Sequence, residues 1–502
     1  MYVNNINFKQ IIIYHTNDLH GRFATYDEDD RTIGIEKISK VVNLSLLNNK
    51  NTFWFDAGDF IHGTPRMTNS PTDKLIDMIN SLPLNAICTG NHDYNLSIDY
   101  LHKLSKSLDT YILSANTINK ETNTPILLPY IIYNVDINND DYISEDSNDH
   151  YKDNIKIGVF GLSTPETAYK TNPNNVKDII FDDPYKVANN IVSILKDNCD
   201  FIIALTHLGL DVSSEYTSEK LAKNVDGIDL IIDGHSHSIL ENGLKVNNTT
   251  IVQAGSHGYY LGKVTLLLNK DKIYIRPELL NEDDVNSIIK NPDNFIQDKL
   301  RNIDELTNQA LNHIITYNPR ELSGNRELVR CTECELGNLI ADAIKWKTKT
   351  DIAIVNGGTL RTGLPQGNIT FKNLISIFPF ENVVQSANIK GKIIKELLEH
   401  AISSAPNSFG GFMDISGMVF SFNRNNEVGK KIINININGI ELDDEKEYTI
   451  STLDFIFAGG DGYSMLTSLK VDHIFGNIEY IVAEYLNIVK DINIKVGRIR
   501  MI

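Results

Sequence analysis

The sequence predicts an α/β protein built in two parts that one helix connects. In the first half of the 502-residue chain, short apolar runs alternate with helical stretches, which is typical of a sheet flanked by helices. From Asn294 to Asn318, apolar residues recur every three or four positions as in one amphipathic helix, and Pro319 follows. A second alternation of helices and strands comes after it. The predicted segments are a first domain at 1–297, a helical linker at 298–317 and a second domain at 318–502.

Eight short apolar runs, rich in β-branched residues, are predicted to be strands of the first domain. They are Phe8–His15, Thr52–Phe55, Ala86–Thr89, Tyr111–Ser114, Ile155–Phe160, Phe201–Thr206, Gly227–Ile232 and Thr250–Gln253. Several of them are followed by Asp, Asn or His. Because open α/β sheets bind ligands at the carboxyl ends of their strands, we expect these residues to form one site. The stretch 138–153 is rich in Asp and Asn and is expected to be a surface loop, since its spacing matches no calcium-binding loop.

The second domain is predicted to be a mixed α/β fold. Its helices are expected at Glu335–Lys347, Lys390–Ser403 and Ile478–Val489, and its strands at Asp351–Val355, Met418–Phe422, Ile432–Ile437 and Tyr448–Thr452. Two glycine-containing loops, Asn356–Arg361 and Ala458–Gly462, follow strands or helices of this set. Cys331 and Cys334 precede the first helix and are either a redox pair or, as we favour, two ordinary thiols.

Composition excludes several classes of partner. The formal net charge of -18 would repel a nucleic-acid polymer or an anionic membrane surface. We find no apolar window long enough for a membrane span. No signal peptide is visible at the N-terminus, so the chain as written is expected to be cytoplasmic, or periplasmic or extracellular if a leader was removed.

The first two polar clusters offer carboxylates and an imidazole. Asp18 and His20 lie two residues apart after a buried strand, although alone they would be read as an Asp turn with a surface histidine. Asp59 follows the next strand and a glycine, and its carboxylate can bridge two cations. Alone, Asp59 would be read as a helix cap.

Three further strand ends add ligands of the same kind. Asn91 offers an unusual neutral amide oxygen, and His92 beside it can face a substrate. His207 ends another strand, while His235 and His237 are two residues apart and would point the same way in an extended segment. A lone histidine at any of these places would more often be structural. Five such motifs, all after strands, favour a metal centre.

These motifs, HTNDLHG, DAGD, GNHD, THLG and GHSH in this order, resemble the calcineurin-like metallophosphoesterase domain. The later blocks are similar to the 5'-nucleotidase family, which includes ecto-5'-nucleotidases, UDP-sugar hydrolases and 2',3'-cyclic-nucleotide phosphodiesterases. The resemblance covers nearly the whole chain. It implies a four-layer α/β/β/α metal domain, a helical linker and a mixed α/β C-terminal domain that holds the nucleotide.

Carried over position by position, the resemblance implies two divalent metal ions. The first would be bound by Asp18, His20, Asp59 and His237, and the second by Asp59, Asn91, His207 and His235. Two such cations about 4 Å apart can share a hydroxide and hold the phosphoryl oxygens of an in-line displacement. The mixed ligands suit Zn, Mn, Fe or Co. His92 would stabilise the phosphoryl group or protonate the leaving oxygen.

One position departs from the family pattern. Many members carry Asp three residues after this histidine, whereas this chain has Asn95, which cannot stabilise an imidazolium as a carboxylate would. Asn at this place resembles the cyclic-phosphodiesterase branch. Asp93 is expected to be a structural acid beside the site, and His62 is either a rim or a surface residue with no assigned role.

The resemblance also implies a set of nucleotide-binding residues. They are Arg330, Asn356, Arg361, Phe380, Asn382, Gly417, Phe455 and Asp461. The two arginines match phosphate ligands, and the two phenylalanines match aromatic residues that sandwich the base. The two asparagines resemble base contacts, Asp461 resembles the acceptor for the ribose hydroxyls, and Gly417 allows the backbone to approach the base. Alone, either phenylalanine would more often be a core residue, and the Gly-Gly-Asp-Gly loop would usually be only a turn.

On this basis we expect a dinuclear-metal phosphoesterase, a monomer or a homodimer, that hydrolyses nucleoside 5'-monophosphates to nucleoside and phosphate. Closure about the helix at 294–318 should accompany turnover, because the metals and the nucleotide residues lie on different domains. The alternatives are a 2',3'-cyclic-nucleotide phosphodiesterase with 3'-nucleotidase activity, a UDP-sugar hydrolase, or a non-catalytic nucleotide-binding protein. The complete set of metal ligands speaks against the last.

Overall fold

The computed structural model divides the chain into two compact units, Met1–Thr307 and Asn308–Ile502. The boundary between them falls inside the predicted linker. The described residues are 9–27, 31–137, 154–171, 173–212, 214–269, 272–379, 382–489 and 492–502. The predicted loop 138–153 and Phe380 lie outside these ranges. None of the described helices is long and apolar enough to cross a membrane.

The first unit contains two six-stranded sheets, ordered β14-β13-β1-β2-β3-β4 and β11-β12-β10-β9-β7-β6. The strands of the first sheet are β1 (Lys9–Thr16), β2 (Thr52–Asp56), β3 (Ala86–Cys88), β4 (Tyr111–Leu113), β13 (Leu261–Asn269) and β14 (Lys272–Leu280). Those of the second are β6 (Tyr130–Asp136), β7 (Asn154–Ser163), β9 (Phe201–His207), β10 (Leu230–Ile232), β11 (Leu244–Val246) and β12 (Thr249–Val252). A small pair, β5 (Thr117–Asn119) and β8 (Ile179–Phe181), completes the strands. The eight strands predicted from the sequence are therefore confirmed, except that β10 begins at Leu230 and not at the predicted Gly227.

Alternation along β1 explains why the two sheets pack face to face. Ile11 and Ile13 belong to an apolar core that also contains Ile203 and Leu205 of β9, so this core lies between the sheets. Tyr14, on the opposite face of β1, packs in a second core with residues of the helices. Because side chains alternate along β1, one face of the strand packs against the second sheet and the other face packs against the helices.

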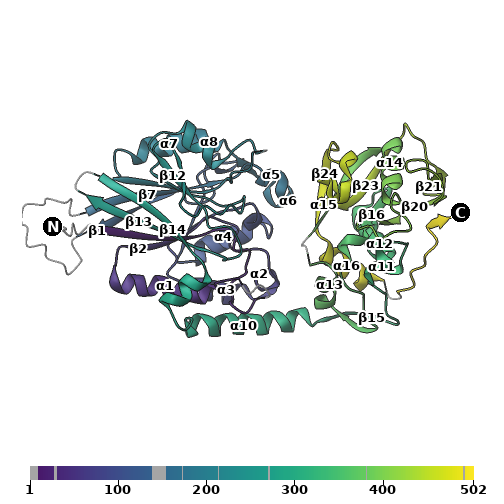
Figure 1. Cartoon of the computed structure of the whole chain (residues 1–502), viewed down its shortest axis with the longest axis horizontal. Coiled ribbons are helices and arrows are strands. Elements are labelled where there is room, and N and C mark those ends of the chain that lie inside the picture. Colours follow the sequence, from purple (N-terminus) through teal and green to yellow (C-terminus); the bar gives the residue numbers. More distant parts are fainter. Residues whose placement is uncertain are drawn as a thin grey trace, which may run out of the picture. The chain divides into compact units, whose positions relative to one another are not determined.

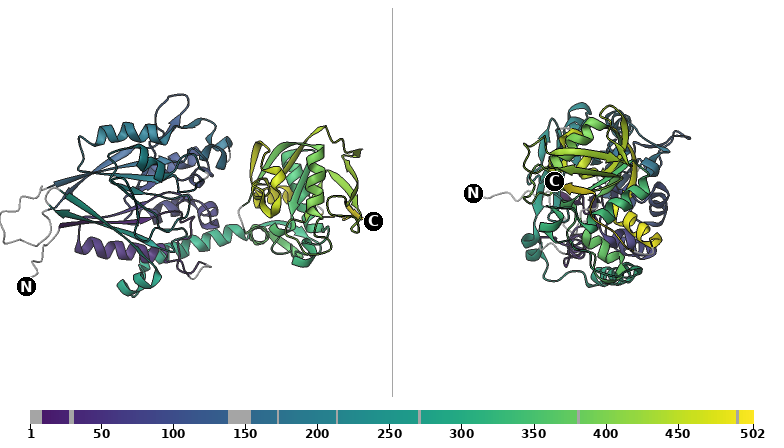
Figure 2. Two further views of the ribbon diagram at one scale, coloured as in Figure 1. Left: turned by 45° about the horizontal axis from the view of Figure 1, so that its top comes forward. Right: turned by 90° about the vertical axis from the view of Figure 1, so that its right-hand side faces the viewer.

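Helices cover the outer faces and complete four layers. The first sheet is covered by α1 (Ile35–Asn48), α2 (Pro65–Asn69), α3 (Thr72–Ile79), α4 (Ile98–Ser107), α9 (Glu282–Ile288) and α10 (Asn294–Leu311), and the second by α7 (Pro184–Leu195) and α8 (Ser218–Asn224). Figure 1 shows α7 and α8 on one side of the sheets and α1 on the other, and the turned view in Figure 2 keeps this order. Two short helices, α5 (Thr167–Lys170) and α6 (Pro173–Val176), follow β7. The predicted α/β/β/α layering is confirmed.

The helix predicted over 294–318 is too long. α10 ends at Leu311, and Ile314–Asn318 forms strand β15, which pairs antiparallel with β17 (Gly367–Thr370). Ile314 continues the helical spacing of apolar residues, and this spacing led to the prediction of a longer helix. The segment Ile314–Tyr317 is nevertheless β-branched or aromatic throughout, and pairing with β17 satisfies its backbone.

The second unit surrounds one apolar core with a five-stranded sheet, β19-β16-β23-β18-β24, and a four-stranded sheet, β22-β21-β20-β25. Its remaining strands are β16 (Ile352–Asn356), β18 (Val383–Lys390), β19 (Met413–Ser416), β20 (Met418–Phe422), β21 (Ile432–Ile437), β22 (Ile440–Glu441), β23 (Glu447–Leu453), β24 (Val471–Asn477) and β25 (Ile499–Met501). Its helices are α11 (Arg326–Val329), α12 (Glu335–Thr348), α13 (Phe371–Ile377), α14 (Gly391–Ala401), α15 (Asp454–Phe457) and α16 (Ile478–Ile488). The predicted helices and strands of this domain are confirmed within two residues at each end.

The cysteine pair before α12 consists of free thiols. Cys334 is the N-cap of α12, and its Sγ accepts a hydrogen bond of 3.2 Å from Gly337 N. Burial raises the pKa of the Cys334 thiol, which disfavours the thiolate that redox exchange needs. The preference for ordinary thiols over a redox pair is supported.

Candidate functional site

The metal-type side chains of the first unit follow strands that run parallel in each sheet. β1, β2 and β3 are parallel neighbours in one sheet, and β9 and β10 are parallel neighbours in the other. Backbone bonds of 2.9 Å from Asp18 N to Gly58 O and from His20 N to Asp59 O join the loops after β1 and β2. The two loops therefore present their carboxylates together.

Five of the seven predicted metal ligands have a left-handed backbone. The φ angles are 51° at Asp18, 49° at His20, 55° at Asp59, 77° at His235 and 51° at His237. Residues with a Cβ rarely adopt this region, which costs about 1–3 kcal/mol each and persists only where the surroundings impose it. Such a concentration of strain is typical of a functional site.

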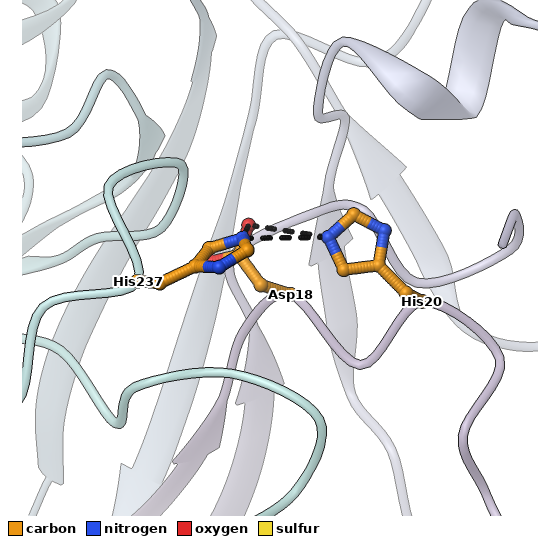
Figure 3. Close-up of side chains that lie close together, drawn as sticks. All are labelled: Asp18, His20 and His237. Atoms are coloured by element: carbon orange, nitrogen blue, oxygen red, sulfur yellow. Dashed lines mark hydrogen bonds and ion pairs between the residues drawn. The ribbon is translucent and has the colours of Figure 1, made fainter. Parts of the chain in front are cut away.

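Two overlapping clusters bring the predicted ligands together. Asp18, His20 and His237 form one cluster, and Asp18, Asp59 and His207 form the other, with ligand atoms in each within 4.8 Å of one another. His237 Nε2 lies 3.4 Å from Asp18 Oδ1 and 3.4 Å from His20 Nε2. Figure 3 shows these three side chains pointing toward one another. His20 Nε2 lies 3.9 Å from Asp59 Oδ2. Two carboxylates and three imidazoles therefore converge on one point.

Glycines make room for this convergence. A Cβ at Gly90 would lie 2.1 Å from Asp59 Oδ1, and a Cβ at Gly58 would lie 2.8 Å from His207 Nδ1. A side chain at either place would displace a ligand. The glycines of the DAGD and GNHD motifs are thus explained by close approach.

Two buried acceptors have the character of metal ligands. His207 Nδ1 donates to Ala57 O at 2.7 Å, which leaves the lone pair on Nε2. His207 Nε2 and Asn91 Oδ1 are both buried without a hydrogen-bond partner, although Asp59 Oδ2 lies 3.2 Å from His207 Nε2. Unpaired buried acceptors are costly unless they bind a ligand. These residues therefore fit divalent cations.

The electrostatics also require positive charge. Asp18 and Asp59 are 0% and 2% exposed, and histidines are their ion-pair partners in the described part of the chain. Burial alone would raise the pKa of Asp59, but the imidazoles, His207 first, hold it well below its usual range. For His207 the two effects have the opposite sign. Burial lowers the pKa of its imidazole, but the carboxylates of Asp59 and Asp18 outweigh burial and raise the pKa to about 10. The cluster holds a cation strongly, whether a proton or a metal.

His92 projects beside this cluster and is held by Asn95. The rings of His92 and His20 are 5.3 Å apart. Asn95 Oδ1 accepts from Thr171 Oγ1 at 2.6 Å, which leaves Asn95 Nδ2 to donate to His92 Nδ1 at 3.0 Å. His62, to which the sequence assigned no role, stacks against His92 with ring centroids 5.7 Å apart. Asn95 thus binds the ring as a donor, where a carboxylate would be an acceptor.

Asp93 holds the loops rather than a ligand. Its Oδ2 accepts from Asp59 N at 3.0 Å and from Gly90 N at 2.8 Å, and its Oδ1 accepts from Ile61 N at 3.0 Å. Burial, followed by the charge of Asp59, raises the pKa of Asp93 to about 7. These bonds support its predicted role as a structural acid.

Not every predicted ligand enters the two clusters, and the sequence interpretation missed some neighbours. The His235 ring lies 5.1 Å from that of His207, but its Nε2 contacts Glu166 Oε2 at 3.3 Å. Glu166 follows β7, one of the strand ends to which no ligand was assigned. His257 was also missed, and its ring lies 5.7 Å from that of His20.

In the second unit, the predicted phosphate and ribose residues lie close together. Asn356 Nδ2 donates to Asp461 Oδ2 at 2.8 Å, and Asp461 has a left-handed φ of 51°. Burial, followed by the charges of Arg326 and Arg361, lowers the pKa of Arg330, while Asp461 acts in the opposite sense. Two predicted phosphate ligands and the predicted ribose acceptor are therefore neighbours.

Two of the predicted base-binding residues, Phe455 and Asn382, lie near the glycine loop that contains Asp461. Phe455 is 44% exposed, and a Cβ at Gly460 would lie 2.5 Å from its ring, so the ring rests on the glycine loop beside Asp461. Asn382 Nδ2 donates to Asp454 Oδ1 at 3.1 Å, next to Phe455. Phe455 is thus a partly exposed aromatic residue at this loop.

Gly417 does not join this group. It follows Ser416, which pairs with Ala353 near the start of β16, whereas Asn356 lies at the other end of that strand. Its φ is 82°, and a Cβ would lie 2.1 Å from Asp351 O. The glycine therefore serves the turn from β19 to β20 and lies away from the predicted base contacts.

Two family models match the chain in the same order as the units. The model for calcineurin-like phosphoesterases matches residues 11–238, and the model for the 5'-nucleotidase C-terminal domain matches residues 314–468. The first range contains all predicted metal ligands, and the second contains all predicted nucleotide residues.

Similar proteins agree with these models. The trifunctional nucleotide phosphoesterase protein of Bacillus subtilis is 29% identical over 94% of this chain, which spans only 33% of that protein. A 5'-nucleotidase of Vibrio parahaemolyticus is 26% identical over 90% of this chain and 84% of its own length. The solved structure of the NAD nucleotidase of Haemophilus influenzae has a TM-score of 0.70 at 19% identity, covering 98% of this chain and 99% of that one, and so shows the fold. The chain belongs to the 5'-nucleotidase family of phosphoester hydrolases, with a calcineurin-like phosphoesterase domain followed by a 5'-nucleotidase C-terminal domain.

Proposed function

We propose that the protein is a metal-dependent phosphoesterase that hydrolyses nucleoside 5'-monophosphates to nucleoside and phosphate. The observation that carries this proposal is the convergence of the buried carboxylates of Asp18 and Asp59 with three imidazoles. A site with this charge needs cations, and cations in turn bind the phosphate of an anionic substrate. The negative net charge of the chain would repel an anionic nucleotide, and bound cations would reverse that repulsion at the site.

Two divalent cations bound here would supply an activated water and neutralise charge on the phosphoryl oxygens. We assign Asp18, His20 and His237 to one cation, Asn91, His207 and His235 to the other, and Asp59 to both. The left-handed backbone at five of these residues indicates that the surrounding fold imposes their backbone conformation.

His92 would act on the phosphoryl group or the leaving oxygen. Because Asn95 Nδ2 donates to His92 Nδ1, the proton of the neutral ring is on Nε2. From that atom the neutral ring donates a hydrogen bond to a phosphoryl oxygen, whereas only the ring protonated on both nitrogens can give a proton to the leaving oxygen.

The second unit would hold the nucleoside. Arg330 and Arg361 bind phosphate, Asp461 accepts from the ribose hydroxyls, and Phe455 stacks on the base, with Phe380 proposed for its other face. The proximity of Arg330, Arg361 and Asp461 supports this assignment. Stacking is tolerant of base identity, so we expect several nucleotides to be accepted.

One observation favours a second candidate, a 2',3'-cyclic-nucleotide phosphodiesterase with 3'-nucleotidase activity. Asn95 stands where many family members carry Asp, and it contacts His92 as a donor. His92 then lacks the carboxylate that would stabilise its protonated form when a poor leaving group departs. A cyclic phosphodiester presents a strained, better leaving group.

A substrate panel separates these candidates. Metal-loaded protein is given AMP, UMP, UDP-glucose, ATP and 2',3'-cyclic AMP, and both phosphate release and the nucleoside and nucleotide products are measured. A higher kcat/KM for the monophosphates supports the proposal. Release from 2',3'-cyclic AMP that exceeds the release from AMP favours the second candidate, and preferred hydrolysis of UDP-glucose would indicate a UDP-sugar hydrolase.

The panel also tests the non-catalytic alternative. If the protein only binds nucleotides, phosphate release stays at the buffer rate with added Mn²⁺ and does not change with a chelator. If it is a metal-dependent enzyme, the chelator stops release and renewed Mn²⁺ restores it.

A further inference from the structure

We propose that Glu166 is a positioning residue that turns the imidazole of His235 toward the second metal ion. Glu166 Oε2 lies 3.3 Å from His235 Nε2, and the two side chains are only 9% and 6% exposed. Glu166 belongs to neither of the two metal-type clusters among the described residues. Its contact with the centre therefore runs through the histidine.

The turn that carries Glu166 is firmly held. Glu166 N donates to Thr164 Oγ1 at 3.3 Å, and Thr167 Oγ1 donates to Thr164 O at 2.7 Å. Thr164 and Thr167 are fully buried. This turn joins β7 to α5, so the carboxylate is fixed to the second sheet rather than to a loose surface loop.

The contact selects one ring nitrogen of His235. The carboxylate accepts a hydrogen bond from Nε2–H, so the lone pair of the neutral ring is on Nδ1. His207 shows the same arrangement with the nitrogens exchanged, because its Nδ1 donates to Ala57 O and its Nε2 is left without a hydrogen-bond partner. Each proposed histidine ligand of the second metal thus has one nitrogen tied to an oxygen.

His235 is held both through its backbone and through its ring. Its backbone has a strained φ of 77°, and its N donates to both oxygens of Asp18, at 3.2 and 3.0 Å. These bonds fix the backbone, and the orientation of the ring depends on the contacts of the side chain itself. Glu166 supplies the second point that fixes the ring.

This inference rests on the metal centre proposed above, and its test reads metal binding directly. The wild type and the variants Glu166→Ala and Glu166→Gln are stripped of metal and titrated with Mn²⁺ in a calorimeter. Asp226→Ala is the control, because Asp226 is exposed in the turn before β10, at the opposite end of that strand from His235. The visible spectrum of Co²⁺-loaded protein and the thermal midpoint of metal-free protein are recorded for each.

We expect Glu166→Ala to weaken one of the two sites by about 10–100-fold and to alter the Co²⁺ spectrum, as loss of a carboxylate partner does for other histidine ligands. Glu166→Gln keeps an oxygen acceptor and should recover most of the affinity. The control and the metal-free thermal midpoints should match the wild type.

Two results would overturn the inference but not the proposed metal centre. The first is a wild type with two metal sites whose affinities do not change in Glu166→Ala. The second is an equal weakening of both sites together with a lower thermal midpoint of the metal-free protein, which would indicate a structural role. A wild type that binds fewer than two metals would instead overturn the proposed centre, and the role of Glu166 with it.

Discussion

The proposed metal ligands of the first unit and the proposed nucleotide ligands of the second unit differ in burial and in backbone conformation. Asp18 and Asp59 are buried, and five of the proposed metal ligands have a left-handed backbone. In the second unit, Phe455 is half-exposed, and Asp461 alone has a left-handed backbone among the described non-glycine nucleotide residues. Close-packed carboxylates must be placed in advance, whereas an aromatic face and arginines can adjust to a ligand.

The difference predicts where substitutions separate binding from chemistry. Changes in the first unit should alter metal content or kcat, and changes in the second should alter KM. The variants below test this division from the largest expected effect to the smallest.

Replacing Asp59 by Ala should remove both metals and almost all activity. Asp59 is shared by the two proposed sites, so its loss leaves neither complete. We expect activity to fall at least about a thousandfold, since the metals supply several kcal/mol of transition-state stabilisation. Elemental analysis and phosphate release measure the two effects, with the exposed Asp109→Ala as the control. Two tightly retained metals in the Asp59 variant would refute the proposed centre.

Replacing His92 by Ala should lower kcat by about 10²–10⁴-fold while both metals remain bound. His92 lies beside the cluster and donates protons or hydrogen bonds rather than binding metal. Steady-state kinetics with AMP and metal analysis of the same sample separate these roles. His102→Ala, an exposed histidine on α4, should behave as the wild type. Loss of metal in the His92 variant would place His92 among the ligands instead.

Replacing Phe455 by Ala should raise KM for AMP about 5–150-fold, the range for one lost base stack. A small aryl phosphate has no base, so its KM should not change. The double variant with Phe380→Ala should lose more of the nucleotide preference, and the exposed Tyr317→Ala is the control. An equal loss on both substrates would argue against base stacking.

Replacing Asp414 by Asn should change only the stability of the second unit. Burial raises the pKa of Asp414 to about 7, above an unfolded value of about 4. The folded state therefore holds the proton more tightly, and the resulting stability is complete below pH 4 and lost as pH rises through 7. In the variant, this pH-dependent part of the free energy of unfolding, up to about 4 kcal/mol, should disappear.

Urea unfolding at pH 4 and pH 8 measures this change through Trp346, which lies on α12, in a Trp54→Phe background. AMP hydrolysis should be unaffected, because Asp414 accepts from Cys334 N within the core. An unchanged pH dependence in the variant would show that Asp414 is not the titrating group.

The strands and the metal motifs could be predicted from the sequence because each has a local pattern. Ile11 and Ile13 alternate with Tyr14 as a two-sided strand requires, and Asp, Asn and His are rarely found together after five strands by packing alone. The nucleotide residues depended on the family resemblance, because phenylalanine, arginine and glycine are common in any α/β domain.

Other features had no local pattern to predict them. Glu166 is a single carboxylate whose partner is 69 residues away, so no spacing rule connects it to His235. Ile314 fits a helical and an extended period equally, and only pairing with β17 decides between them. The positive φ of Gly417 serves a turn, which is the commonest reason for such a glycine and which the resemblance obscured.

The central claim is that the first unit holds a two-metal centre on which hydrolysis depends. Metal-stripped protein is titrated with Mn²⁺ while bound metal and phosphate release from AMP are measured in parallel. We predict that binding saturates at two ions per chain and that activity reaches its plateau only as the second ion binds. Full activity without metal, or a plateau of binding and activity at one ion, would contradict the claim.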